Sequence, residues 1–270
     1  MGALQWDADG ERLFETGVDH AVLYLMNDDG SYENGVPWNG ITGITESPEG
    51  AEANDIYADN IKYLSLISKE DWKGTIKAYT FPKEFNECMG NFGVGTAAGS
   101  GTTPDTLGFK AHIGQQKRRK FALSWRTRLG NDTVGDSFAY KIHLAWGLSA
   151  APSEMDHATQ NDSPEAQEFS WEISSIPPQT AAKIPVDGST TELTKKSIQP
   201  CAHVFAVSKV VTFDGVKNND QTNTSLAALE DYLYGHDAEG TTEESYATIP
   251  TLTQLIKCYA DGDYAEWEAS

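Results

Sequence analysis

Histidine and cysteine side chains are the first candidates for chemistry, because they serve as general bases, nucleophiles and metal ligands. No histidine of this chain belongs to an HExxH sequence or stands beside a serine in a nucleophile-elbow sequence. Cys88, Cys201 and Cys258 form an odd set without metal-ligand spacing, so we expect reduced, mostly buried thiols. We predict neither a zinc site nor a catalytic triad from the scattered histidines, which are His20, His112, His143, His157, His203 and His236.

Paired carboxylates could also act, since two of them can flank a glycosidic bond. Glu168 and Glu172 fall on one face of a predicted strand, but among 40 Asp and Glu residues such pairs arise by chance. The glycines at 93, 95 and 99 lack the spacing of a dinucleotide fingerprint. We therefore expect no catalytic residue and no cofactor, and an enzyme ranks third among the interpretations of this sequence.

The net charge of −20 is unevenly distributed along the 270 residues. Residues 1–60 carry −12, residues 61–213 carry +2, and residues 214–270 carry −10. Phosphate affinity comes mainly from Lys and Arg, so this balance opposes tight binding to nucleic acid. No apolar run approaches the roughly 18 residues of a membrane span. The N-terminus has no signal-peptide pattern, so we expect synthesis in the cytoplasm and no membrane partner.

Period-two alternation in several segments predicts a mainly β chain. "KFALSWRTRL" (120–129) and "FAYKIHLAWGL" (138–148) are typical of a half-buried hairpin, the second with Phe138 to Leu148 on one face. Residues 82–90, 223–235 and 250–260 show short helical signals, with Gly90 and Gly235 as expected stops. We predict one domain, a β-sandwich with one or two flanking short helices.

Three segments interrupt this pattern. Residues 47–60 hold four acids and no base, which predicts a long acidic loop between strands 36–46 and 61–68. Both alternating sets of 61–68 carry apolar groups, so we expect that strand to be covered on both faces. A Gly-rich loop is predicted at about 90–108, and residues 214–270 form an acidic, helix-containing C-terminal segment.

One basic cluster, Lys117 to Lys120, precedes the clearest strand. One interpretation of this cluster is a solvated turn. The alternative is a docking site for acidic segments of a neighbouring copy, because oppositely charged surfaces direct ordered association.

The stretch from "WNGITGITESPEG" through "FPKEFNECMG" (38–90) resembles the major tail proteins, or tail tube proteins, of long-tailed bacteriophages of Gram-positive hosts. The similarity continues through "IGQQKRRKFALSWRTRLGNDTVGDSFAYKIHLAWGLSAAPSE", "NDSPEAQEFSWEISSIP" and "LAALEDYLYG", and so covers most of the chain in order. This resemblance implies a structural subunit of the virion whose strands join those of neighbours in an inner β-barrel. It further implies stacked hexameric rings around a conduit for genome ejection, with double-stranded DNA in transit.

The same resemblance implies tape-measure, tail terminator and distal tail proteins as partners beside the chain itself. We expect no additional immunoglobulin-like domain. The inner barrel is predicted to use strands near 36–46, 61–68, 119–129 and 138–148. An alternative is a carbohydrate-binding or adhesion module of a phage tail, with Trp38, Trp72, Trp125 and Trp171 as candidate stacking platforms, although Trp125 and Trp171 lie on apolar strand faces.

These observations combine into one hypothesis about the acidic segment. We expect it to reach the next ring and to be received by the basic cluster. The residues of the predicted contact are Glu49, Glu52, Asp55 and Asp59 on one side and Lys117, Arg118, Arg119 and Lys120 on the other.

Overall fold

The fold is described from a computed structural model. The described residues are 6–7, 9–50, 52–68, 70–93, 110–112, 114, 117–159, 162, 166–176, 183–186, 194–197, 202–212, 215–218, 220–236, 245–252 and 254–255.

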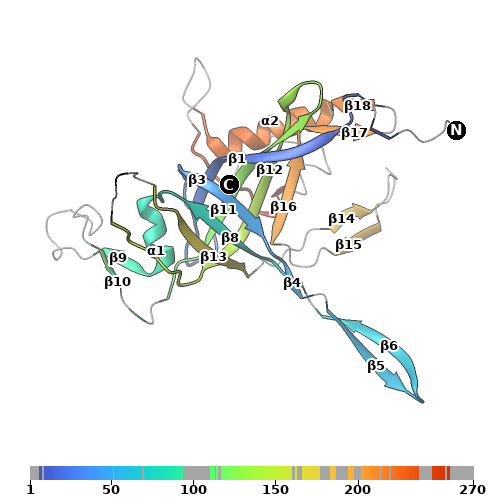
Figure 1. Ribbon diagram of the computed structural model, residues 1–270, viewed down its shortest axis with the longest axis horizontal. Helices are drawn as coiled ribbons and strands as arrows, with labels where there is room; N and C mark the ends of the chain where they lie inside the picture. Colours follow the sequence, from blue (N-terminus) through green and yellow to red (C-terminus); the bar gives the residue numbers. More distant parts are fainter. Residues whose placement is uncertain are drawn as a thin grey trace.

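The body is one antiparallel sheet, drawn in Figure 1. Its strands follow the order β2-β1-β11-β12-β13-β8-β3, and β16 pairs with β12 beside that path. Their bounds are β1 Leu13–Leu25, β2 Val36–Pro37, β3 Ile41–Glu46, β8 Lys73–Ala78, β11 Phe121–Asn131, β12 Gly135–Ala150, β13 Phe169–Ser175 and β16 His203–Val207. The predictions of a mainly β chain and of a 120–129/138–148 hairpin are confirmed.

In the described part of the chain, five small two-stranded units lie outside this sheet. They are β4 (Glu49–Gly50) with β7 (Glu70–Asp71), β5 (Ala53–Ala58) with β6 (Ile61–Ile67), β9 (Asn91–Gly93) with β10 (Lys110–His112), β14 (Lys183–Val186) with β15 (Thr194–Ser197), and β17 (Lys209–Thr212) with β18 (Gly215–Asn218). The β9–β10 pair brackets the predicted Gly-rich loop, of which residues 94–109 lie outside the described residues.

The predicted helices at 82–90 and 223–235 are confirmed. The first is a 3₁₀ turn, η1 (Lys83–Phe85), running into α1 (Asn86–Met89), and the second is α2 (Asp220–Tyr234). Gly90 and Gly235 follow them with φ of 92° and 68°, the left-handed conformation that ends many helices. The prediction at 250–260 is followed only to Leu255, with helical backbone at residues 252, 254 and 255. Within the described part of the chain, no helix is long and apolar enough to cross a membrane.

The sheet buries both of its faces. On one face, η1 and α1 insert Phe85, Cys88 and Met89 among strand residues that include Trp125 and Trp171. Burial raises the pKa of the Cys88 thiol to about 12, as expected for a reduced, packed cysteine. The opposite face is covered by α2 and by residues 249–255. That second core contains Val22, Tyr24, Ile142, Leu144, Trp146, Leu226, Leu229 and Leu233.

The strand β12 changes faces along its length, contrary to the predicted single apolar face from Phe138 to Leu148. Ile142, Leu144 and Trp146 join the core under α2, whereas Leu148 joins the core on the η1 and α1 side. Gly147, with φ of 64°, lies at this change, and the pairing with β11 shifts register between Phe121 and Leu123. An inserted residue reverses the alternation, so one strand serves both cores.

The sheet also curls. Its terminal strand β3 packs against β1, and Ile41 and Ile44 of β3 contact the first core together with Val18 of β1. The curl does not close: the strands that the structure describes form no complete barrel within one chain. β2 and β3 end the path of the sheet, and β16 ends the branch beside β12, so these strands are edges that can pair with another chain.

Candidate assembly surfaces

The clearest candidate functional feature is the β5–β6 hairpin, which Figure 1 shows extending away from the body. Asp59 and Asn60 join its strands with φ of 52° and 63°. Two consecutive residues at positive φ form the tight turn whose twist matches an antiparallel pair. The short β4–β7 pair continues the ladder between this arm and the body, because β3 leads into β4 and β7 leads into β8.

The hairpin exposes apolar side chains on both faces. Ile56 pairs with Leu64 on one face, and Ala53 pairs with Ile67 on the other. Seven large apolar residues are exposed: Ile56, Tyr57, Ile61, Tyr63, Leu64, Leu66 and Ile67, with exposed fractions from 37% at Leu64 to 72% at Ile67. Soluble monomers rarely leave so many apolar groups together in water, and such patches mark interaction sites.

Two sequence predictions fail here. Residues 47–60 do not form a long loop, because residues 53–58 are strand β5 and Asp59 opens the turn. The loop prediction weighted the acids and overlooked the Asp59-Asn60 turn, which is followed by the apolar strand 61–67 and preceded by Ile56 and Tyr57. The strand 61–67 is not covered on both faces either, since each of its residues is exposed. The strand does carry apolar side chains on both faces, but the described residues of this chain do not bury them.

The acids of the predicted contact already have neighbours within the chain. Asp55 accepts from Ser65 Oγ at 2.7 Å and pairs with Lys62 Nζ at 2.7 Å, and these contacts lower the pKa of its carboxyl group. Glu49 Oε2 lies 2.5 Å from Lys73 Nζ, which raises the pKa of that lysine. All these groups are solvent-accessible, so the pairs stabilise the fold little and can exchange partners.

Glu52 and Asp59, the two remaining acids, mark the ends of the arm. The Glu52 N–H donates to Ser68 Oγ at 3.0 Å, and the Ser68 N–H donates to the Glu52 carbonyl at 3.0 Å. These two bonds close the base of the hairpin, whereas Asp59 lies at its tip. The carboxyl group of Asp59 is therefore carried farthest from the body.

The side chains of the basic cluster differ in how firmly they are held by contacts within the chain. Arg119 is held inside the chain: it pairs with Glu33, with Glu87 at 3.1 Å, and donates to the Met26 carbonyl at 2.9 Å. Although burial alone would lower the pKa of Arg119, the two glutamates raise it. This guanidinium ties the start of β11 to the β1–β2 connection and to α1, and its role is structural.

The other three cations of the cluster are held less firmly by the rest of the chain. Arg118 donates to the Ala150 carbonyl at 3.0 Å, and Lys117 Nζ lies 3.0 Å from Asp28, a pair whose side chains are 88% and 96% exposed. Such an exposed pair is easily exchanged. Lys117 and Lys120 line a surface pocket with Asp28 and Glu87. Pairing of this cluster with the hairpin of another copy stays a prediction.

A charge reversal tests that pairing. We expect the double variant Lys117→Glu/Lys120→Glu to fold like the wild type. It should raise the concentration needed for self-assembly several-fold, since each lost charge pair is worth roughly 0.2–1 kcal/mol. Sedimentation over a concentration series measures this threshold. The control places the same charge change at Lys77, an exposed residue of β8. An equal effect in both variants, or none in either, would contradict the pairing.

The four tryptophans of the carbohydrate alternative do not form an exposed platform. Trp38, Trp125 and Trp171 are at most 3% exposed and belong to the first core. Trp72 is half-buried and stacks on His203 with ring centroids 5.5 Å apart. The exposed aromatic residues of the arm are Tyr57 and Tyr63, which were not among the predicted stacking platforms.

The strands predicted for an inner barrel are placed in two different structures. Residues 121–131 and 135–150 form the central pair of the main sheet, and residues 41–46 form its edge strand β3. Residues 61–67 lie outside that sheet, in the arm. Only the first three segments can therefore line one continuous sheet within this chain.

Comparisons with known proteins add a distant structural likeness. No protein-family model matches the sequence, and no curated protein matches it either. Among solved structures, a chain of the anti-feeding prophage baseplate, determined by cryo-electron microscopy with 6-fold symmetry, aligns with a TM-score of 0.28 and 13% identity. The alignment covers 63% of this chain and 92% of that chain. A TM-score of this size supports no conclusion about function.

Proposed function

We propose that this chain is a non-catalytic structural subunit of a phage tail tube, which assembles with its own copies into stacked hexameric rings around a conduit for the genome. The observation that carries the proposal is the β5–β6 arm, with apolar side chains exposed on both faces. A virion location and contacts with tape-measure, terminator and distal tail proteins belong to the same proposal.

Burying the exposed apolar side chains of the arm against a partner is energetically favourable. An isolated two-stranded hairpin is at best marginally stable in water, and burying a large apolar side chain stabilises by roughly 1.5–3 kcal/mol. Because the seven exposed residues are already partly shielded by one another, their burial is worth on the order of 10 kcal/mol. Association itself costs about 4–15 kcal/mol. The arm alone is therefore close to balance, and lateral contacts must complete the assembly.

The edge strands supply those lateral contacts. β2, β3 and β16 lie at the limits of the main sheet, where backbone N–H and C=O groups can pair with another chain. Pairing the edges of neighbouring copies around a ring satisfies these groups and leaves no edge for uncontrolled addition. A ring in which every copy contributes one arm and its sheet edges is then far more stable than any single contact.

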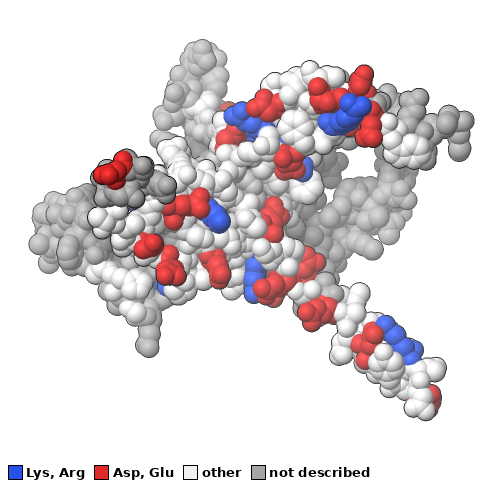
Figure 2. Space-filling view, in the orientation of Figure 1, with Lys and Arg blue, Asp and Glu red and all other residues white. Residues whose placement is uncertain are grey.

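The surface charge suits a conduit that lets DNA pass. Figure 2 shows carboxylates spread over the body and the arm, with Lys and Arg in small groups. Binding to a phosphate backbone depends on displacing counterions with cationic side chains. A lumen built from such a surface would hold double-stranded DNA weakly, as passage requires.

The same charge predicts how assembly responds to salt. Copies that each carry −20 repel one another, and added ions shorten the range of that repulsion to about 10 Å at 0.1 M salt. We expect the concentration needed for assembly to fall several-fold as ionic strength rises, measured by sedimentation or light scattering of the purified protein. Sodium and magnesium chloride at matched ionic strength separate screening from specific ion binding. Assembly that is indifferent to ionic strength would contradict this electrostatic account, and a protein that stays monomeric in every buffer would contradict the proposed function.

A further inference from the structure

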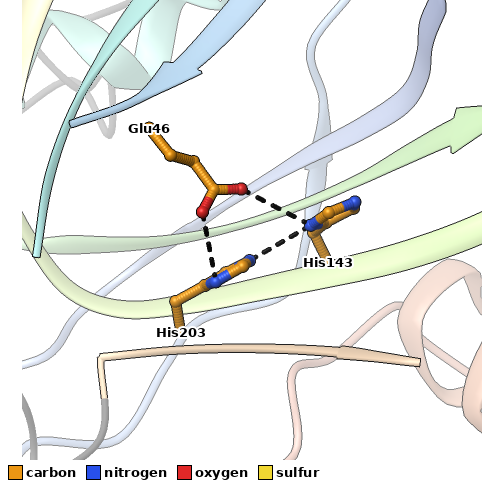
Figure 3. A group of neighbouring side chains, drawn as sticks. All are labelled: Glu46, His143 and His203. Carbon is orange, nitrogen blue, oxygen red and sulfur yellow. Dashed lines mark hydrogen bonds and ion pairs between the residues drawn. The ribbon is translucent and has the colours of Figure 1, made fainter. Parts of the chain in front are cut away.

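Three side chains that are far apart in sequence meet where the curled sheet brings its edges together. Glu46 ends β3, His143 lies in β12, and His203 begins β16, as Figure 3 shows. Glu46 Oε1 is 3.6 Å from His143 Nδ1, and Glu46 Oε2 is 3.5 Å from His203 Nδ1. The two rings approach at 3.1 Å, between His143 Nδ1 and His203 Nε2.

The three separations above use both carboxylate oxygens of Glu46 and both ring nitrogens of His203. With one ligand atom taken from each residue, the three atoms lie within 4.8 Å of one another, a grouping that modest side-chain rotation would close around a metal ion. Zinc binds His nitrogen and carboxylate oxygen at about 2.0–2.2 Å, which in a tetrahedral arrangement places neighbouring ligand atoms about 3.3 Å apart. Two histidines and one glutamate are also a known set of three protein ligands for zinc, with water in the fourth position. The side chain of Glu46 is 36% exposed, whereas those of His143 and His203 are 7% and 11% exposed. The open side, at Glu46, gives an ion and its water access.

The surroundings of His143 point its Nδ1 lone pair into the cluster. Its other nitrogen, Nε2, lies 3.2 Å from Thr127 Oγ1, and that hydroxyl donates to Glu15 Oε1 at 2.6 Å. Because the hydroxyl proton is used toward Glu15, Thr127 can accept the Nε2–H of His143. A second hydrogen bond of this kind fixes the tautomer of most metal-binding histidines.

Aromatic rings hold both histidines in place. Trp125 stacks on His143 with ring centroids 5.0 Å apart and planes 7° apart, and on His203 at 5.4 Å and 10°. Trp72 covers His203, and its indole N–H lies 3.5 Å from Glu46 Oε2. Ring motion is therefore restricted before any ion arrives, which lowers the entropic cost of binding.

The charges around the cluster favour a cation. Burial lowers the pKa of both histidines, for His143 to about 4. Glu46 and Glu15 are the nearby acids, and Lys141 is held against Glu15 on the far side of His143. The formal charges of Glu46, Glu15 and Lys141 sum to −1.

We propose that Glu46, His143 and His203 bind one divalent transition-metal ion of the zinc type, with water as the fourth ligand. The ion joins β3 to β12 and β16 and so fixes the base from which the arm extends. All three ligands belong to one chain, so this inference does not depend on the proposed function.

Zinc titration into metal-free, full-length protein tests the site. Calorimetry after removal of metals with EDTA should find one strong zinc site per chain. We expect Glu46→Gln to weaken binding at least about tenfold, His203→Asn to weaken it more, and His157→Asn, at an exposed histidine outside the cluster, to leave it unchanged. Zinc should raise the Tm of the wild type by several degrees, and of neither ligand variant.

Cobalt provides a second, spectroscopic test. Co²⁺ in the wild type should give the intense visible bands of a four-coordinate ion with nitrogen and oxygen ligands, and these bands should disappear in Glu46→Gln, which replaces a partly exposed side chain by its isostere. Calcium or magnesium should not compete, because the histidines favour softer ions. Absence of saturable zinc binding would overturn the proposal. Equal binding in wild type, Glu46→Gln and His203→Asn would also overturn it, since the ion would then occupy the acidic surface.

Discussion

Replacing residues 53–67 by a two-residue Asn-Gly turn should abolish assembly of the purified protein while leaving its Tm within a few degrees of the wild type. Among the residues that the structure describes, the arm contributes none to either buried core, so we expect its removal to leave both cores covered. The chain can be rejoined without strain, because Glu52 and Ser68 are already linked by two hydrogen bonds. Assembly should fail because the removed surface carries the apolar burial, on the order of 10 kcal/mol, that offsets the cost of association.

A version of this experiment with point substitutions keeps the arm and removes its apolar surface. We expect Tyr63→Ser, Leu66→Ser and Ile67→Ser together to have the same effect as the deletion. Val134→Ser, at a 57% exposed apolar residue of the β11–β12 turn, is the control and should assemble normally. Thermal melts verify that each variant folds. Normal particles from the deletion protein would show that the arm is not an assembly element.

Gly147→Ala should cost the fold at least about 3 kcal/mol in the free energy of unfolding. Gly147 has φ of 64°, where a side chain is strained by about 1–3 kcal/mol. A Cβ there would also lie 2.2 Å from the Ile176 carbonyl oxygen, which is backbone and cannot rotate away. The substitution thus damages the point where β12 passes from one core to the other, between Trp146 and Leu148.

Gly43 provides the matched control for this prediction. Its φ is not positive, and a Cβ added to it would meet no other atom within 4 Å, so Gly43→Ala should change stability by less than about 1 kcal/mol. Urea denaturation at constant temperature measures both variants. Equal stabilities of the two alanine variants would contradict the assignment of Gly147 as a required left-handed position.

The regular parts of the fold were predictable because each is encoded locally. Alternation identified β11 and β12, the spacing of Leu226, Leu229 and Leu233 identified α2, and Gly90 and Gly235 marked helix ends. These signals depend on neighbours a few residues away, so tertiary contacts altered them little. The change of face at Gly147 is also local, but a glycine within a strand does not reveal the sign of its φ.

The arm and the histidine cluster could not be obtained in the same way. Acidic residues led to a loop prediction at 47–60. The Asp59-Asn60 turn, and Ile56 and Leu64 that pair across it, instead favour a hairpin. The cluster depends on topology: β16 pairs with β12, and the curl of the sheet carries β3 across to them. No spacing between positions 46, 143 and 203 signals that arrangement.

Electron microscopy of the concentrated, purified protein tests the central claim most directly, namely that copies of this chain assemble into rings through their arms and sheet edges. The account predicts six-fold annular particles or hollow tubes in which the β5–β6 arm of each copy is buried against another copy. Dispersed monomers at every protein concentration and ionic strength, or closed rings whose arms remain free in solvent, would contradict it.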